Sequence, residues 1–306
     1  MDADEVRAGI AAIEAEHGPW HSHNIHLGHG VWTRSDRELV ENSRLRRYLQ
    51  AVSDAAGDSL AGLRVLDLAC EEGAFGIEMA RQGAEVVAIE GRAGNVARAR
   101  FAAEALGLDR YQVSQGDIRE LSVETSGEFD VVFSVGILYH LDAPAVFEHV
   151  HELARMSRRL LFLSTHVSRF AERRREFGGR SYRGCVVEEH PAGSGKRDRE
   201  GNLRASLDNE VSFWLTRPSL FNLLANAGFS SVLELQMPHM LRAHNPGNTV
   251  NLVAFRGERV EVPRSELVAN DPPARWPERG REPVHTSQSL RHRLAQELRR
   301  LRSARS

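Results

Sequence analysis

The 306-residue sequence has only two cysteines, and it has no apolar run long enough to cross a lipid bilayer. Cys70 and Cys185 provide neither a disulfide framework nor a zinc-ligand spacing, which indicates a reducing compartment. The N-terminus is acidic and amphipathic and does not have the pattern of a secretory signal peptide. These absences predict a soluble cytoplasmic protein with no membrane partner.

The sequence also lacks an excess of charge of one sign. Its 40 Lys and Arg residues and 42 Asp and Glu residues give a formal net charge of −2 at pH 7. This near-neutral balance argues against a protein that coats nucleic acid. Hydrophobic residues make up 41% of the chain, so its length suits one large domain with additions.

Residues 64–80 predict a buried strand, a tight turn and the first turns of a helix. Asp67 lies near the carboxyl end of the strand, and Gly73 opens the helix. Glu71 and Glu72 would repel a pyrophosphate, which this position in a doubly wound sheet usually attracts. They would not repel a sulfonium cation or an amino group. The turn is therefore better suited to S-adenosylmethionine than to a dinucleotide.

Strand and helix patterns alternate regularly through the centre of the chain. This alternation predicts an α/β fold with a Rossmann-like, doubly wound, mostly parallel seven-stranded sheet. We divide the chain into an N-terminal helical lid (1–60), a central domain (61–257) with an insertion after the fifth strand (166–215), and a Pro- and charge-rich linker with a basic C-terminal helix (258–306). The strands are expected at 65–68, 85–90, 111–114, 160–163, 231–236 and 249–255, and residues 129–141 are expected to form a further strand, the fourth, that runs into a loop.

Acidic residues follow two of the predicted strands. Glu90 ends the second strand, where such folds bind ribose hydroxyls, although a helix cap or a surface acid would also explain it. Asp117 follows the third strand and could accept a hydrogen bond from an adenine amino group while Ile118 packs on the ring. We therefore expect an adenosine site at this edge of the sheet.

Four motifs in order resemble the class I S-adenosylmethionine-dependent methyltransferases: VLDLACEEGAFGIEMA, VVAIEGR, GDI and FDVVFSVGILYHLDAP. More narrowly, they are similar to the branch related to the tRNA wobble-uridine carboxymethyltransferases, as are FWLTRPSLFNLLANAGF and HNPGNT. The resemblance covers about residues 60–256 and implies an antiparallel final strand. It implies cofactor contacts at Asp67, Ala69, Gly73, Glu90, Asp117, Ile118, Ser134 and Tyr139, to which we add the neighbouring Cys70 and Gly91.

The sequence departs from this family pattern at two glycines. Ala69 and Glu71 stand where the motif has glycine, and Gly73 alone remains in the turn. A glutamate lacks the conformational freedom of glycine. We therefore expect the methionine end of the cofactor to be held differently from the common pattern.

Residues 20–33 are dense in aromatic residues, histidines and glycines, and they follow a helix expected over 3–17. The four histidines at 21, 23, 26 and 29 could be a metal cluster, but no carboxylate or cysteine accompanies them at a ligand spacing, so we expect no metal. We interpret the segment as a lid over the substrate pocket. Its expected substrate contacts are Trp20, His23 and Trp32.

The insertion is predicted to be long and irregular, and its part 192–202 has the composition of a loop without fixed structure. From it we assign Tyr182, Glu189 and Trp214 to the substrate side. The run from Glu188 to His190 is otherwise typical of a solvated loop.

Methyl transfer is an in-line displacement, so positioning is its first requirement, and a base is needed when the nucleophile carries a proton of high pKa. His140 and His166 follow the fourth and fifth strands and are our candidate bases, with Tyr139 beside them. A structural role in closing the loop is the alternative for His140.

We interpret the chain as a methyltransferase that acts on a small-molecule acceptor, perhaps one of secondary metabolism. The alternative is a tRNA-modifying enzyme, because arginines surround leucines at helical spacing near the C-terminus. A third reading is a non-catalytic binding module, against which the acids Asp67, Glu90 and Asp117 argue. A homodimer is compatible with any of these.

Overall fold

The structure is a computed structural model that describes residues 1–34, 43–56, 59–235 and 248–257. Three expectations fall wholly or partly outside these residues: positions 35–42 and 57–58 of the N-terminal helical lid, most of the HNPGNT motif, and the basic C-terminal helix. None of the described helices is long and apolar enough to cross a membrane.

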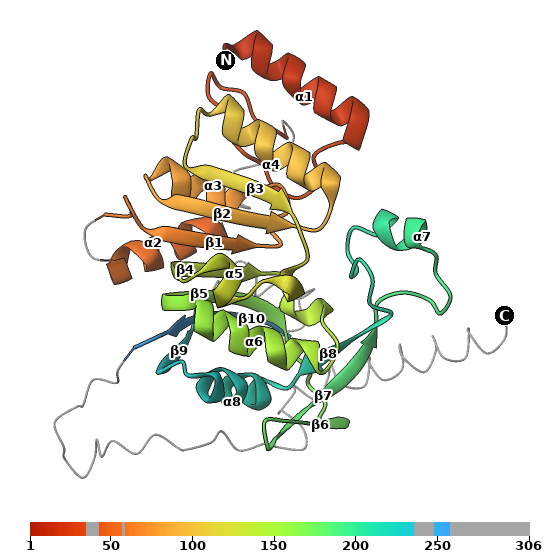
Figure 1. Cartoon of the computed structure of the whole chain (residues 1–306). Helices are drawn as coiled ribbons and strands as arrows, with labels where there is room; N and C mark the ends of the chain where they lie inside the picture. Colours follow the sequence, from red (N-terminus) through yellow and green to blue (C-terminus); the bar gives the residue numbers. More distant parts are fainter. Residues whose placement is uncertain (35–42, 57–58, 236–247, 258–306) are drawn as a thin grey trace, which may run out of the picture.

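A seven-stranded sheet forms the centre of the molecule, with strand order β3-β2-β1-β4-β5-β10-β9 (Figure 1). Strands β1 to β5 pair in parallel, and β10 is antiparallel to both of its neighbours, so the predicted fold class is confirmed. Its strands are β1 (Arg64–Leu68), β2 (Glu85–Glu90), β3 (Tyr111–Gln115), β4 (Phe129–Val135), β5 (Ser157–His166), β9 (Ser231–Glu234) and β10 (Thr249–Phe255).

Helices cover both faces of this sheet because its strands are apolar on both sides. Along β4, Val131 and Phe133 point into one core and Val132 into the other. The first core contains Tyr48 and Phe75, and the second contains Phe147. The covering helices are α2 (Ser43–Ala56), α3 (Ala74–Arg81) and α4 (Ala93–Ala105) on one face, and α5 (Val123–Ser126), α6 (Ala145–Met156) and α8 (Arg217–Ala227) on the other.

The parallel register brings the carboxyl ends of the first four strands to one edge. Asp67 is opposite both Ala88 of β2 and Phe133 of β4. Short 3-10 turns follow β3 and β4 at this edge, η2 (Ile118–Glu120) and η3 (Leu138–His140). Ligands of such sheets bind in the crevice outside these strand ends.

The insertion is ordered, which corrects the expectation of an irregular segment. It contains a second sheet of three antiparallel strands, β6 (Arg173–Phe177), β7 (Arg180–Glu188) and β8 (Val211–Leu215), and the helix α7 (Lys196–Gly201). The part 192–202 is fixed by arginines that bond to main-chain carbonyls, such as Arg199 to Ser194 at 3.0 Å. The sequence of 192–202 is polar and has no apolar periodicity, so it did not indicate this ordered structure.

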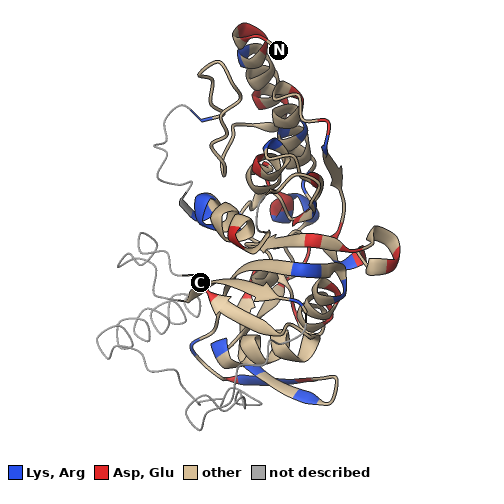
Figure 2. Cartoon of the chain, turned by 90° about the vertical axis from the view of Figure 1, so that its left-hand side faces the viewer, with Lys and Arg blue, Asp and Glu red and all other residues tan. Residues whose placement is uncertain are grey.

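Positive charge gathers on the hairpin of β6 and β7, at the lower end of the molecule (Figure 2). Elsewhere on the described surface, Lys and Arg are mixed with Asp and Glu (Figure 2). Arg173 to Arg175 lie on β6, which is an edge strand of the three-stranded sheet. Charged side chains on an edge strand commonly prevent pairing with strands of other molecules.

The N-terminal segment is anchored to the sheet domain through one buried carboxylate. After α1 (Ala3–His17), the backbone N–H groups of residues 21, 22 and 23 donate to Glu72 at 2.8, 3.1 and 2.6 Å. The Glu72 side chain is fully buried and also pairs with His21 Nδ1 at 3.1 Å. Arg98 of α4 donates to the carbonyls of His17 and Gly18. This segment is thus a fixed part of the fold.

We predict that Glu72→Gln lowers the free energy of unfolding by about 2–4 kcal/mol, because the amide would place a donor against buried backbone donors. Chemical denaturation measures the change. The control is Glu104→Gln, which alters an exposed side chain on α4 and should leave stability nearly unchanged. Equal stability of the two variants would show that Glu72 is not the anchor.

Candidate active site

The turn after β1 requires a left-handed backbone at three residues. Ala69, Glu71 and Gly73 have φ values of 50°, 50° and 85°. The first two are the positions where the sequence departs from the family glycines, so the chain keeps the glycine conformation without the glycines, at a cost of about 1–2 kcal/mol per residue. At Gly73 a Cβ atom would also lie 2.5 Å from the Tyr111 hydroxyl.

Glu90 joins this turn to the start of α4. Its carboxylate accepts hydrogen bonds from the backbone N–H of Glu71 at 2.9 Å and of Arg92 at 2.8 Å. Asn95 contributes a longer contact of 3.4 Å. Burial raises the pKa of Glu90, while these donors oppose the increase. A carboxylate has about four acceptor positions, so capacity remains for a hydroxyl of a ligand.

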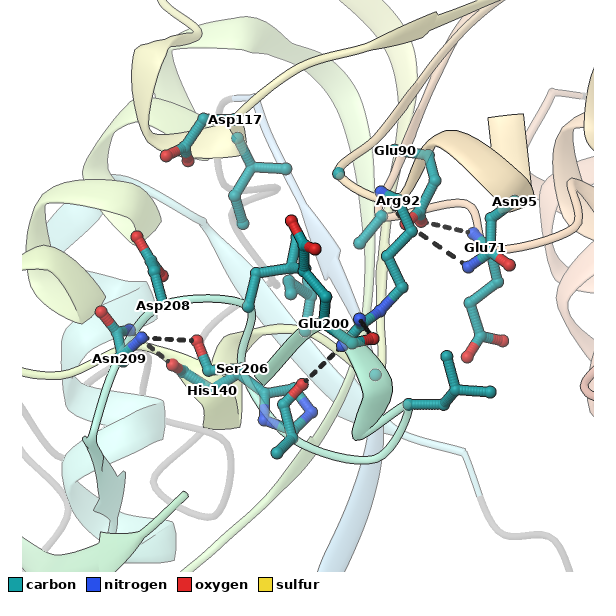
Figure 3. A pocket seen from close by; sticks show the side chains of 18 of the residues that line it. Glu71, Glu90, Arg92, Asn95, Asp117, His140, Glu200, Ser206, Asp208 and Asn209 are labelled. Atoms are coloured by element: carbon teal, nitrogen blue, oxygen red, sulfur yellow. Dashed lines mark hydrogen bonds between the residues drawn. The ribbon is translucent and has the colours of Figure 1, made fainter. Parts of the chain in front are cut away.

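A cavity of about 1040 Å³ lies at this edge of the sheet. Figure 3 shows Glu71, Glu90, Arg92 and Asn95 along one side and His140, Ser206, Asp208 and Asn209 along another. Of the predicted cofactor and catalytic residues, the cavity is lined by Ala69, Glu90, Gly91, Asp117, Ile118, Tyr139 and His140. The structure thus brings both groups together.

Four predicted cofactor residues do not line this cavity. Asp67 and Cys70 are buried beneath the turn, Gly73 caps α3, and Ser134 is fully buried in β4. Asp67 accepts from the backbone N–H of Gly76 at 2.8 Å, and burial raises its pKa to about 7. We place Asp67, Cys70 and Gly73 in the support of the turn, and Ser134 in the interior of the sheet.

Asp117 is bound by an arginine that we did not predict. Arg119 donates to it through its backbone N–H at 2.8 Å and through its guanidinium, with Nε 2.9 Å from Oδ2. This side-chain pairing lowers the pKa of Asp117. Arg119 also pairs with Asp208 of the insertion, so Asp117 stands at a junction between the sheet edge and the insertion.

Other lining residues were missed as well. Arg44, Arg92 and Asn95 line the cavity, and so do several residues of the segment 194–209. Arg92 follows Gly91 directly, and this adjacency was an available signal. Arg44 lies in a separate helix, and no spacing in the sequence relates it to the turn.

A second cavity of about 490 Å³ adjoins the first and shares Glu71, Tyr139 and His140 with it. Its wall includes an aromatic group: the Trp214 and His166 rings are stacked at 4.8 Å, and Tyr139 lies 4.3 Å from His166. The Trp214 indole N–H donates to the Tyr139 carbonyl at 2.9 Å. This arrangement leaves aromatic surface for a flat ring.

The candidate bases differ in their surroundings. His140 Nδ1 lies 2.9 Å from the Glu189 carboxylate, and Glu189 also accepts from the backbone N–H of Ser206 at 2.9 Å. Burial alone would raise the pKa of Glu189, but His140 and the Ser206 donor lower it. Burial lowers the pKa of His166, and burial raises that of Tyr139 to about 12, so Tyr139 keeps its proton at neutral pH.

The structure corrects the expectation that residues 188–190 form a solvated loop. The Glu189 side chain is 6% exposed and His190 is 3% exposed, whereas Glu188 is exposed. His190 is held by the Ser206 carbonyl, 2.6 Å from Nε2. The local composition of 188–190 could not reveal this burial, because Glu189 and His190 contact Ser206, which is remote in sequence.

The predicted lid does not reach either cavity through its aromatic residues. Trp20 is buried, Trp32 packs on His26 at 4.7 Å, and His23 lies beside Phe75. Only His21 and Ser22 of residues 20–33 line the larger cavity. Tyr182 is also a core residue, 1% exposed and stacked on Phe147. We therefore assign Trp20, His23, Trp32 and Tyr182 no contact with the acceptor.

The histidines do not form a metal centre with other ligands. Among the described residues, no group of three or more His, Cys, Asp or Glu side chains is placed to hold a metal ion. The His21 ring instead pairs with Glu72, and the His26 ring packs on Trp32.

We predict that Asp67 makes stability fall as pH rises. Its pKa is 3.8 in the unfolded reference and about 7 in the folded protein, so between these values the unfolded state loses its proton first. The contribution is complete below about pH 4 and is lost by about pH 7, up to roughly 4 kcal/mol. Asp67→Asn should remove this loss in denaturation curves, whereas the control Asp109→Asn should retain it. Parallel pH profiles for wild type and Asp67→Asn would contradict this assignment.

Comparisons with known proteins agree with this geometry. Residues 65–159 match the family described as methyltransferase domain. Over 109 residues the chain is 33% identical to the ubiquinone biosynthesis O-methyltransferase of Acinetobacter baumannii (strain AYE), which covers 36% of this chain and 45% of that protein. The chain therefore spans less than half the length of this curated relative.

Solved structures extend the likeness to most of the chain. The N-terminal domain of EvdMO1, crystallised in the presence of SAH and D-fucose, is 26% identical, with a TM-score of 0.62 over 85% of this chain and 98% of that one. Full-length EvdMO1 has a TM-score of 0.54 at 23% identity and covers 84% of this chain and 48% of that one. Residues 65–159 thus resemble a methyltransferase domain, and the chain has the Rossmann-like fold seen in S-adenosylmethionine-dependent methyltransferases.

Proposed function

We propose that the protein transfers a methyl group from S-adenosylmethionine to a hydroxyl group of a small molecule. The observation that carries this proposal is the pair of adjoining cavities, one with Glu90 and Asp117 and the other with aromatic rings, which meet at Tyr139 and His140. The relatives support it, since one is named an O-methyltransferase and another was crystallised with SAH and a sugar.

The larger cavity has the chemistry that adenosine requires. Glu90 has acceptor capacity for the ribose hydroxyls, and Asp117 with Ile118 would receive the adenine amino group and ring. Glu71 and Arg44 line the same cavity and carry the charges that match an ammonium and a carboxylate. The glutamate that replaces a motif glycine thus becomes a ligand for the methionine end.

The cofactor supplies the methyl group on a positively charged sulfur. His140 would accept the proton of the acceptor hydroxyl at Nε2 while the oxygen–methyl bond forms and the methyl–sulfur bond breaks. Glu189 holds the Nδ1 side of the ring, which leaves Nε2 as the acceptor of the proton. His166, hydrogen-bonded to the Thr249 hydroxyl at 3.0 Å, and Trp214 form the wall that orients the acceptor.

The acceptor is a small ring compound in this proposal. The second cavity is walled by Tyr139, His166 and Trp214, and the segment 202–205 lines it as well. The basic arginines of β6 line neither cavity. The tRNA alternative stays a prediction, because the basic C-terminal helix on which it rests lies outside the described residues.

Isothermal titration of the full chain with S-adenosylmethionine tests the proposal. We expect binding, and we expect Glu90→Gln to weaken it by about 2 kcal/mol, or roughly thirtyfold, because buried hydroxyls lose a charged acceptor. The control is Glu85→Gln, at the exposed opposite end of β2. A wild-type chain that binds no S-adenosylmethionine would overturn the proposal.

For catalysis we predict that His140→Gln lowers kcat by about a hundredfold or more, and that S-adenosylmethionine affinity stays within a few-fold. Transfer of a radiolabelled methyl group to a panel of catechols and monosaccharides provides the assay. His151→Gln, a change on the outer part of α6, is the control. Full activity of His140→Gln would move the role of base to His166.

A further inference from the structure

One segment of the insertion contacts both the cofactor edge of the sheet and the candidate base. Residues 200–209, which we call the bridging segment, begin with the last two residues of α7 and continue beyond it, and several of them line the larger cavity opposite Glu90. Figure 3 shows Glu200 of this segment near the Arg92 side chain, and Ser206, Asp208 and Asn209 on the side of His140. Arginine side chains hold the segment at the cofactor edge, and the segment forms hydrogen bonds with Glu189 and with the His140 backbone on the other side.

At the cofactor edge, two arginines hold the bridging segment. Arg92 donates from its guanidinium to the main-chain carbonyls of Glu200, Asn202 and Ala205, at 2.5, 2.9 and 3.2 Å. Its backbone N–H donates to Glu90, so one residue connects the carboxylate and the segment. Arg119 supplies the second attachment through its pair with Asp208.

Gly91 lies close to the bridging segment. At Gly91, a Cβ atom would lie 2.4 Å from the Leu207 side chain. The Leu207 side chain therefore packs directly on the backbone of Gly91, the residue that follows Glu90. Gly91 is thereby explained as a contact point for the segment as well as a part of the cofactor cleft.

On the side of the candidate base, the bridging segment binds both His140 and Glu189, the carboxylate that pairs with it. The Ser206 N–H donates to Glu189 at 2.9 Å, and the Asn209 side-chain amide donates to the His140 carbonyl at 2.8 Å. The Ser206 carbonyl in turn binds His190. Glu189 thus receives one hydrogen bond from the candidate base and one from the segment.

We propose that Arg92 is a positioning residue for the base: through the bridging segment it fixes Glu189 and hence the orientation of His140. The proposal rests on the proposed function, because it takes His140 as the base. Glu189 lies in a chain that leaves β7 and returns through α7, so its position depends on where that chain is held. Main-chain carbonyls from three residues converge on one guanidinium, whose planar group of N–H donors has a fixed geometry.

The test compares Arg92→Met with wild type in kinetics. We expect kcat to fall about tenfold or more, because a displaced base loses its alignment with the acceptor. The pH–rate profile should change in the same direction as in Glu189→Gln, and the double variant should show less than the sum of the two effects. The kcat is measured at saturating S-adenosylmethionine, because Arg92 also lines the cofactor cavity and a change in cofactor affinity should not enter the comparison.

A second readout does not depend on activity. Trypsin can cleave after two exposed arginines, Arg204 in the bridging segment and Arg197 in α7. We expect both cleavages, followed by mass spectrometry, to be faster in Arg92→Met than in wild type. Asp208→Asn breaks the other attachment at an exposed side chain and should accelerate the same cleavages. Arg92→Lys should restore part of kcat, and Arg100→Met, on the exposed side of α4, is the matched control.

Unchanged cleavage and unchanged kcat in Arg92→Met would overturn the proposal. A loss of activity that comes only from weaker S-adenosylmethionine binding, with the pH profile of wild type, would overturn it as well. Failure of the proposed function is separate: the wild-type chain would not bind S-adenosylmethionine, whatever happens to cleavage of the bridging segment.

Discussion

The hydrogen bonds that Glu90 accepts from the backbone of Glu71 and Arg92 hold together the two loops of the cofactor cleft. The first loop needs support, because it places Ala69 and Glu71 in a left-handed conformation that side chains disfavour. The second loop begins α4 and carries the guanidinium that reaches the insertion. A single buried carboxylate therefore stabilises a strained turn and defines the place where adenosine would bind.

The insertion completes the site that the sheet begins. The parallel strands bring Asp117, Tyr139 and His140 to one edge, but the wall opposite them comes from residues that follow β7 and α7. Glu189 is the clearest case, since it is remote in sequence from His140 and lies 2.9 Å from it. In the proposed function, the cofactor residues belong to the common fold, and the acceptor side combines His140 and His166 of that fold with Glu189 and Trp214 of the insertion.

Sequence reasoning succeeded where the physical signal is local. Apolar strands that end in acids pointed to Glu90, which lines the larger cavity, and regular alternation predicted the mostly parallel sheet. The family resemblance implied the antiparallel last strand, which is β10. It failed where order comes from long-range polar contacts. The fixed structure of 192–202 depends in part on Arg92, which is far away in the chain, and the N-terminal segment is held by Glu72, so neither could be read from composition. The aromatic content of residues 20–33 suggested a pocket wall, but Trp20 is buried in the apolar core instead.

The most direct test is a crystal structure of the full chain with S-adenosylhomocysteine. The account predicts that the ribose hydroxyls lie within hydrogen-bonding distance of Glu90, that adenine lies on Ile118 beside Asp117, and that the sulfur faces Tyr139 and His140. A ligand bound elsewhere, or one whose ribose does not contact Glu90, would contradict the account.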